Sequence, residues 1–270
     1  MEITHKWFAL AAFVVACGEG SPPQRTSVAV AATPERVAVR ALAPPRTVAP
    51  PQPVDSPVVV IDPGHPSETS AGTVQHGVRE VHIAWLVALR LRDLLQRDGY
   101  RVTMTKARED QNVRNADRAR IANHAGAALM VRLHCDAAAG SGFTLYHPDR
   151  RGTAQGVTGP SDPVIRASGS AAAAVHAGMA GVLKGRLRDG GIRGDSDTYV
   201  GSRQGALTGS IFAEVPVVTI EMVVLGSRAD AAFISGEDGQ ALMARAIAAG
   251  VRRFVPLASA ARQDTTPRRR

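Results

Sequence analysis

The chain has 270 residues, of which 44% are hydrophobic and 21% charged, so it is neither a mostly disordered nor a fibrous protein. Its formal net charge of +8 suits an anionic partner, such as a nucleic acid, a membrane surface or an acidic polymer. Its two cysteines, Cys17 and Cys135, are too few for a disulfide-stapled scaffold.

Residues 1–17 have the pattern of an export signal. Lys6 precedes an apolar run over residues 7–16, which is shorter than the ~20 residues of a membrane-spanning helix. The run ends in the letters VVAC, which resemble the bacterial lipobox, and no A-x-A cleavage site lies near its end. We therefore expect Cys17 to be lipidated and the protein to be a lipoprotein anchored to a membrane surface in the cell envelope, facing the periplasm or the cell wall. A signal that is simply cleaved is the alternative, and export in either form argues against nucleic acid as the partner.

Three further regions follow the signal. Residues 18–56 contain eight prolines among Ala, Val, Ser and Thr, and are predicted to be a disordered tether. Residues 257–270 are a polar, basic tail that ends in three arginines. Residues 57–256, between tether and tail, carry the segments that can form a packed core and are predicted to be one domain.

Strand and helix patterns alternate within residues 57–256. Strands are predicted over 57–61, 100–105, 127–133, 143–146 and 215–220. Helices are predicted over 80–97, 114–125, 171–187 and 240–254, the first of them ending at Asp98-Gly99. Residues 149–169, rich in Gly, Pro, Ser and Asp, are predicted to be a loop or insertion. The alternation predicts an α/β fold with a mostly parallel central sheet flanked by helices on both faces.

Four polar side chains stand where these segments begin or end. His65, His134 and Glu221 follow three of the apolar strands, and Glu80 opens the first helix. Because ligands of open α/β sheets collect at the carboxyl ends of strands, we expect the four to converge. Two histidines and one carboxylate, with an open fourth position, are typical of catalytic zinc. The remaining carboxylate can take a proton from the water that the metal activates.

Motifs spread over residues 57–256 resemble, in the same order, those of the zinc-dependent N-acetylmuramoyl-L-alanine amidases of the Amidase_3 type. They are IDPGH (61–65), G-x-x-E (77–80), LLQRDGYRVTMTK (94–106), R-x-x-x-A-N (118–123), LMVRLH (129–134), FTLY (143–146), GIRG (191–194) and VPVVTIE (215–221). The resemblance implies Zn²⁺ held by His65, Glu80 and His134, with Glu221 as the catalytic glutamate. It also implies hydrolysis of the amide between N-acetylmuramic acid and L-alanine, with peptidoglycan as the anionic partner.

The chain departs from the family's blocks at several positions. Pro66 follows His65 where the family has a second Gly, and Lys106 replaces the usual Arg. Residues 132–137 read RLHCDA where the family's strand end reads S-x-H-x-N-A, and MVV rather than Gly-Phe follows Glu221. These differences concern substrate preference and turnover more than the metal site.

Alternatives remain open from the residues alone. A zinc peptidase that cuts the stem peptide would need the same metal chemistry, and a wall-binding lipoprotein could carry a degenerate hydrolase fold. A regulatory partner, unknown in identity, would be needed if residues 149–190 hold an inhibitory insertion.

Several other polar residues near the expected site have their own interpretations. We expect His76 at the site mouth, His82 on another face of its helix and Cys135 packed in the core as a free thiol. Asp62 either orients a metal-bound imidazole or forms a turn.

Overall fold

The computed structural model of the chain describes residues 56–257. The predicted signal (1–17), with Cys17, therefore lies outside the described residues, as do the tether (18–56) and the basic tail (257–270) apart from residues 56 and 257. No helix in the described range is long and apolar enough to cross a membrane.

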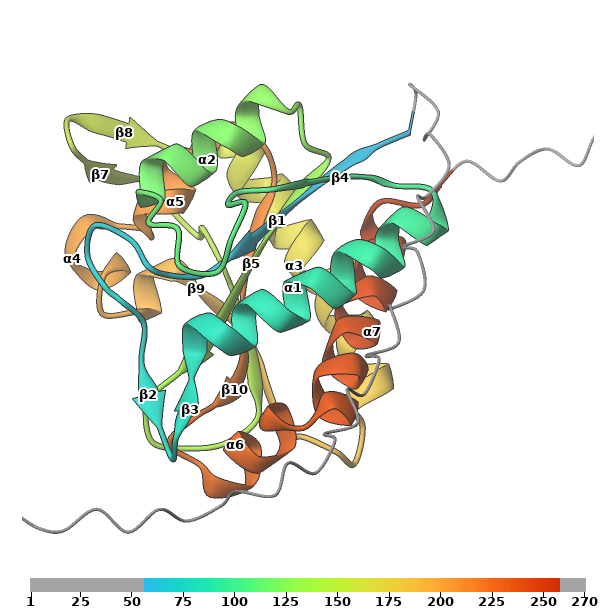
Figure 1. Cartoon of the computed structure of the whole chain (residues 1–270). Helices are drawn as coiled ribbons and strands as arrows, with labels where there is room; N and C mark the ends of the chain where they lie inside the picture. The colour runs from blue at the N-terminus through green and yellow to red at the C-terminus, as the bar shows by residue number, and fades with distance from the viewer. Residues whose placement is uncertain (1–55, 258–270) are drawn as a thin grey trace, which may run out of the picture. The chain divides into compact units, whose positions relative to one another are not determined.

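A six-stranded sheet forms the centre of the described range (Figure 1). In spatial order its strands are β4 (Arg101–Met104), β1 (Val58–Pro63), β5 (Leu129–Asp136), β10 (Val217–Val224), β6 (Phe143–His147) and β9 (Asp189–Gly194). The first four run parallel, β6 runs antiparallel to β10, and β9 runs parallel to β6. The carboxyl ends of β1, β5 and β10 consequently meet at one edge, as expected for a mostly parallel sheet.

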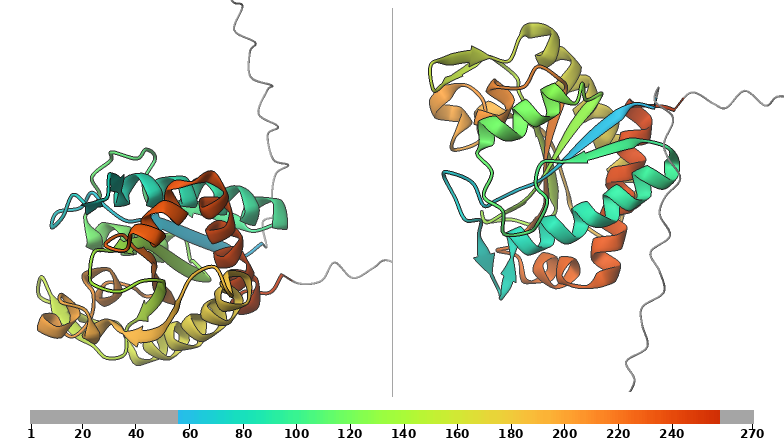
Figure 2. Two further views of the ribbon diagram at one scale, coloured as in Figure 1. Left: turned by 90° about the horizontal axis from the view of Figure 1, so that it is seen from below. Right: turned by 45° about the horizontal axis from the view of Figure 1, so that its top comes forward.

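Helices cover both faces of this sheet, which confirms the predicted fold class (Figure 2). The helices α1 (Glu80–Asp98), α3 (Asp162–Leu183) and α7 (Glu237–Phe254) pack on one face. The short helix α6 (Arg228–Ser235), which precedes α7 along the chain, contacts β10 and α7. On the other face lie α2 (Asn115–His124) and α5 (Thr208–Ile211). The short helices η1 (Asp195–Asp197) and α4 (Gly201–Gln204) precede α5. Two hairpins flank the sheet: β2–β3 (Val74–Gln75, Val78–Arg79) and β7–β8 (Gly152–Ala154, Val157–Gly159).

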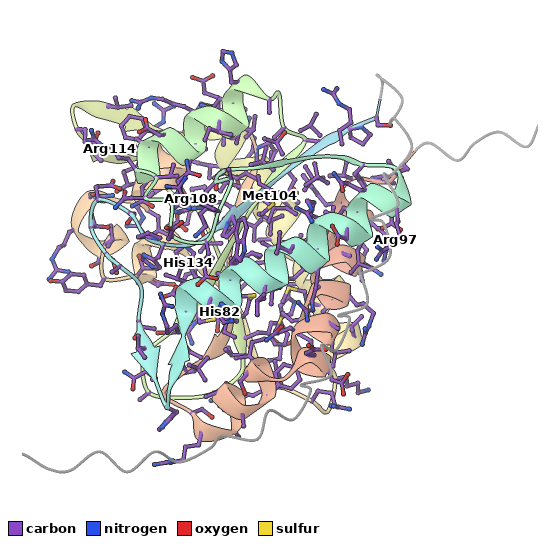
Figure 3. The ribbon with its side chains drawn as sticks, viewed as in Figure 1. His82, Arg97, Met104, Arg108, Arg114 and His134 are labelled. Carbon is purple, nitrogen blue, oxygen red and sulfur yellow. The ribbon has the colours of Figure 1, made fainter. Side chains whose placement is uncertain are left out.

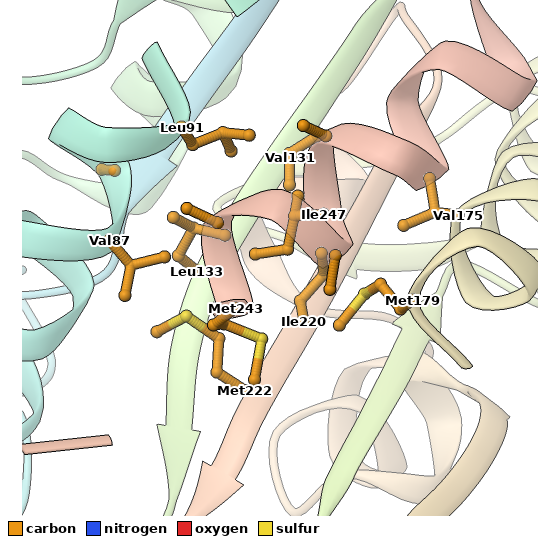
Figure 4. Packing of buried hydrophobic residues seen from close by; sticks show 14 of the residues in the cluster. Val87, Leu91, Val131, Leu133, Val175, Met179, Ile220, Met222, Met243 and Ile247 are labelled. Carbon is orange, nitrogen blue, oxygen red and sulfur yellow. The ribbon is translucent and has the colours of Figure 1, made fainter. Parts of the chain in front are cut away.

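The apolar core lies between the sheet and the α1–α3–α7 layer (Figure 4). Successive side chains of a strand point to opposite faces, so β5 sends Val131, Leu133 and Cys135 into this core. Arg132 and His134, between them, face the opposite side. Cys135 is buried and unpaired in the apolar cluster, as predicted, and burial raises the pKa of its thiol.

The structure corrects the prediction between residues 149 and 187. Residues 149–169 are not a continuous loop: they contain the β7–β8 hairpin and the first two turns of α3, which begins at Asp162 and ends at Leu183. Pro163 lies in the first turn, where a helix tolerates the missing N–H, so the proline marks a helix start here rather than a loop. The end of the first helix is confirmed, because Gly99 caps α1 in the left-handed conformation (φ 108°).

Candidate metal centre and active site

His65, Glu80 and His134 lie together at the carboxyl edge of the sheet. His65 follows β1, Glu80 is the first residue of α1, and His134 is near the end of β5, close to the first half of α1 in Figure 3. One ligand atom from each lies within 4.8 Å of the others. Gly64 permits this approach, because a Cβ there would come within 2.5 Å of the His134 ring.

The distances from the Glu80 carboxylate to the two imidazoles are close to those between the ligands of a tetrahedral metal. Glu80 Oε1 lies 3.0 Å from His134 Nδ1 and 3.4 Å from His65 Nε2. Two ligands each ~2.0–2.1 Å from a tetrahedral zinc ion are themselves roughly 3.3 Å apart. The two imidazoles meet edge to face, with ring centroids 4.9 Å apart. The donor set of two imidazole nitrogens and one carboxylate oxygen therefore fits Zn²⁺ in both chemistry and spacing.

Contacts behind the ligands fix their orientation and protonation. The Nδ1 atom of His65 is 3.2 Å from the Ser70 carbonyl oxygen. A carbonyl can only accept, so Nδ1 donates and Nε2 of the neutral ring keeps its lone pair for a metal. Burial and the neighbouring His134 lower the pKa of His65 to about 4, which keeps the ring neutral at physiological pH. The Lys106 ammonium donates to the backbone carbonyl of His65, so this substituted residue still supports the ligand.

Glu80 is held as a carboxylate. Its Oε2 accepts from the Thr73 backbone N–H at 3.0 Å and its Oε1 from the Cys135 N–H at 3.2 Å. Burial alone would raise the pKa of Glu80, but the hydrogen bond and charge of His134, together with His65, lower it to about 2. Glu80 is therefore an ionised carboxylate that backbone N–H groups hold beside the two imidazoles.

Glu221 lies beside the three ligand residues without belonging to the cluster. It is in β10, paired in register with His134 on β5. Its Oε2 is buried and has no hydrogen-bond partner among residues 56–257. Burial raises the pKa of Glu221 well above the usual range, and the charges of Glu80 and Asp136 add to this effect. A buried carboxyl of high proton affinity next to a metal site is suited to proton transfer.

A pocket of about 290 Å³ opens over these groups. His65, His134 and Glu221 line it from the sheet edge, while Tyr199 and Val200 line it from the segment before α4. Tyr199 is 75% exposed, and its ring lies against the Arg203 guanidinium, 3.4 Å from ring centroid to Cζ. The pocket thus joins a polar floor to an exposed aromatic rim.

Asp62 has neither of the two roles considered for it from the sequence. It is fully buried in β1, and its partners among the described residues are Arg118, Arg132 and Thr105. Its Oδ1 lies 2.6 Å from Arg118 Nη1, and its Oδ2 lies 2.9 Å from Arg132 Nε. Although burial opposes ionisation, the two guanidinium groups hold the pKa of Asp62 far below its usual range. Asp62 therefore anchors two buried arginines beneath the site.

The other histidines near Glu80 stay outside the cluster. His76, in the turn of the β2–β3 hairpin, has Nε2 3.1 Å from the Gly226 carbonyl oxygen. His82 projects from another face of α1, as predicted, and pairs with Glu109 at 2.9 Å. Neither lines the pocket.

The comparison with protein families assigns residues 59–253 to the N-acetylmuramoyl-L-alanine amidases (Amidase_3). The chain belongs to this family.

Known relatives agree with this assignment. The amidase CwlM of Bacillus licheniformis is 33% identical over 89 residues, a stretch that spans 33% of this chain and 35% of that protein. Among solved structures, the amidase Ami1 of Mycobacterium smegmatis has a TM-score of 0.63 at 21% identity, covering 74% of this chain and 96% of that one. The amidase AmiC2 of Nostoc punctiforme has a TM-score of 0.58 at 20% identity, covering 73% and 96%. At these identities the two structures support the fold alone.

Proposed function

We propose that the protein is a zinc-dependent N-acetylmuramoyl-L-alanine amidase that hydrolyses peptidoglycan. The observation that carries the proposal is the convergence of His65, Glu80 and His134, whose ligand atoms lie within 4.8 Å of one another, with Glu221 beside them. Family membership supports the same reaction, and the formal net charge of +8 suits an anionic wall polymer.

The roles of the four residues follow from their contacts. Zinc at this site would supply a Lewis acid for the amide carbonyl and would lower the pKa of an attacking water. Glu221, buried and unpaired at Oε2, accepts the proton of that water as it attacks. The same carboxyl then donates the proton to the amine of L-alanine, so that the amine leaves neutral. His65 and Glu80 keep their geometry throughout, because backbone groups of Ser70, Thr73 and Cys135 hold them.

A zinc peptidase that acts on the stem peptide is the second candidate, because it would use the same metal chemistry. Mass spectrometry of products from purified peptidoglycan separates the possibilities. We expect free muramic acid termini together with intact stem peptides. Shortened stems would mean a peptidase, and no products in the presence of zinc would mean a wall-binding protein of weak or absent activity. A chelator-treated sample, with and without added Zn²⁺, is the control for metal dependence.

We also propose that the protein is an exported lipoprotein of the cell envelope, anchored through Cys17. The support is the apolar run over 7–16 ending in VVAC, which lies outside the described residues. Replacing Cys17 by Ser should move the protein from the membrane fraction to the soluble fraction. Its activity on peptidoglycan should persist, because the Pro-rich tether separates the anchor from the folded domain. A Cys17→Ser protein that stays with membranes would contradict lipidation as the anchor.

A further inference from the structure

A buried arginine, Arg132, lines the pocket close to the proposed metal ligand His134. Arg132 precedes His134 by two residues in β5, so both side chains project from the same face of the sheet. The residue is only 3% exposed, yet it lines the pocket with His134 and Glu221.

Two hydrogen bonds and the close approach of Gly209 fix the position of the guanidinium group. Its Nε donates to Asp62 Oδ2 and its Nη2 donates to Asn115 Oδ1, each at 2.9 Å. Gly209 leaves room for it, since a Cβ at that position would lie 2.8 Å from Arg132 Cζ and Nη1. Within residues 56–257, however, Nη1 has no hydrogen-bond acceptor. A rigid, charged donor without a partner at a pocket wall is suited to an incoming anion.

The charges around Arg132 favour the same kind of ligand. Asp62 is shared between Arg118 and Arg132, so this buried trio has one positive charge in excess. Two further buried carboxyl groups, those of Asp195 and Glu221, interact electrostatically with Arg132, but neither forms an ion pair with it in the described part of the chain. Buried charge of one sign calls for a compensating partner.

A second unsatisfied group lies on the neighbouring strand. Thr219 is the neighbour of Arg132 in register across β5 and β10, and it too lines the pocket. Its hydroxyl Oγ1 is buried and has no partner among residues 56–257. A free hydroxyl and a free guanidinium N–H on adjacent strands, ~4.8 Å apart at the backbone, can both donate to one carboxylate.

We propose that Arg132, with Thr219, binds the free α-carboxylate of the second residue of the peptidoglycan stem peptide. This inference rests on the proposed amidase function. The second residue, a D-glutamate linked onward through its γ-carboxyl, keeps its α-carboxylate free unless that group is amidated. Arg132 is therefore a specificity residue that distinguishes stems with D-isoglutamate from stems with D-isoglutamine.

The spacing of the two residues along β5 is of the same order as the spacing of the corresponding groups in the substrate. Two residues of a strand span about 6.6 Å, which separates Arg132 from the metal ligand His134 at the backbone. Adjacent Cα atoms are ~3.8 Å apart, so the Cα of the second stem residue lies roughly 6 Å from the scissile carbonyl carbon. The carboxylates of later stem residues lie farther away, because the γ-linkage adds several bonds. Along the stem peptide, the α-carboxylate of the second residue is thus the free carboxylate nearest to the scissile amide.

Two matched ligands test the proposal on the intact protein. The dipeptides L-alanyl-D-isoglutamate and L-alanyl-D-isoglutamine differ only in this carboxylate, and calorimetry gives the Kd of each. We expect the acid to bind about 10- to 100-fold more tightly than the amide, as for a hydrogen-bonded charge pair. The corresponding muramyl dipeptides should differ in kcat/KM in the same direction. Equal Kd values for acid and amide in the wild-type protein would overturn the proposal, whatever any variant does.

Variants then assign the selectivity to Arg132. Arg132→Gln keeps a donor for Asp62, which also retains Arg118, and should bring the acid-to-amide ratio close to one. Arg132→Lys should keep part of the preference, because it restores the charge without the planar fork. Arg120→Gln removes the same charge from an exposed site on α2 and should leave the ratio unchanged.

The outcomes separate this proposal from the proposed function. A ratio that persists in Arg132→Gln contradicts the role of Arg132, even if hydrolysis is confirmed. Failure of the wild-type protein to cleave either muramyl dipeptide or whole peptidoglycan contradicts the amidase function instead.

Discussion

Replacing Glu221 by Gln is expected to lower kcat on peptidoglycan by roughly 10²–10⁴-fold, the usual contribution of a positioned general base. The substitution keeps the size of the side chain and removes only its ability to hold a proton. Zinc content should not change, because Glu221 lies outside the cluster of three ligand residues. KM should change little, so that kcat and kcat/KM fall together. Product release measured by mass spectrometry and zinc measured by atomic absorption check both parts.

Glu80→Gln is the matched comparison for this prediction. Glu80 is also a buried carboxylate at the site, but its Oε1 lies between His65 and His134. Its neutral analogue should therefore lose zinc affinity as well as activity. If Glu221→Gln lost zinc while Glu80→Gln kept it, the two carboxylates would have exchanged roles. Near wild-type turnover of Glu221→Gln would remove Glu221 from the mechanism.

These groups could be predicted to lie together from the sequence, because the parallel order of the strands determines where their carboxyl ends meet. Apolar runs locate β1, β5 and β10, and the parallel order brings whatever follows them to one edge. His65, His134 and Glu221 needed no knowledge of tertiary contacts to be grouped. Glu80 was recognisable because it opens a long amphipathic helix that ends cleanly at Gly99. Local sequence patterns and one rule of topology are thus enough to predict that these four residues lie close together.

The buried ion pairs of Asp62 with Arg118 and Arg132 could not be predicted in this way. From the sequence, Asp62 either orients a metal-bound imidazole or forms a turn, yet in the structure it pairs with arginines 56 and 70 positions further along the chain. Whether an Asp is buried between guanidinium groups depends on side-chain packing, which strand periodicity does not encode. In the sequence, Arg132 stands out as a single charged residue within the apolar run LMVRLH (129–134). A charge inside such a strand requires buried partners, but the sequence does not say which.

Weak local signals explain the missed elements. β9 is an edge strand with the sequence DGGIRG, and glycine is depleted in strands. Its pairing with β6 decides its conformation, so the strand exists through tertiary contact. The first turns of α3 were missed because the local signals conflict. Asp162 and Pro163 favour a helix start, but the Gly and Ser around them are typical of a loop.

His134→Ala is expected to abolish stoichiometric zinc binding and, with it, peptidoglycan hydrolysis. His65 and Glu80 alone would leave two protein ligands, whereas catalytic zinc sites use three. A readout independent of activity is the thermal shift on adding Zn²⁺. A metal that binds only the folded protein stabilises it by about 2.7 kcal/mol at 100 times its Kd, so Tm of the wild type should rise. In His134→Ala that rise should disappear.

His82→Ala provides the control for the loss of an imidazole near the site. His82 lies on α1 two residues beyond Glu80, but its ring pairs with Glu109 and does not line the pocket. This variant should bind one zinc ion, keep its thermal shift and retain activity. Stoichiometric zinc in purified His134→Ala would show that the ligand set is wrong, since the 3.0 Å approach of Nδ1 to Glu80 Oε1 would then be only a hydrogen bond. Loss of zinc in His134→Ala alone, with His82→Ala intact, would show that the imidazole of His134, and not that of His82, is required for the metal.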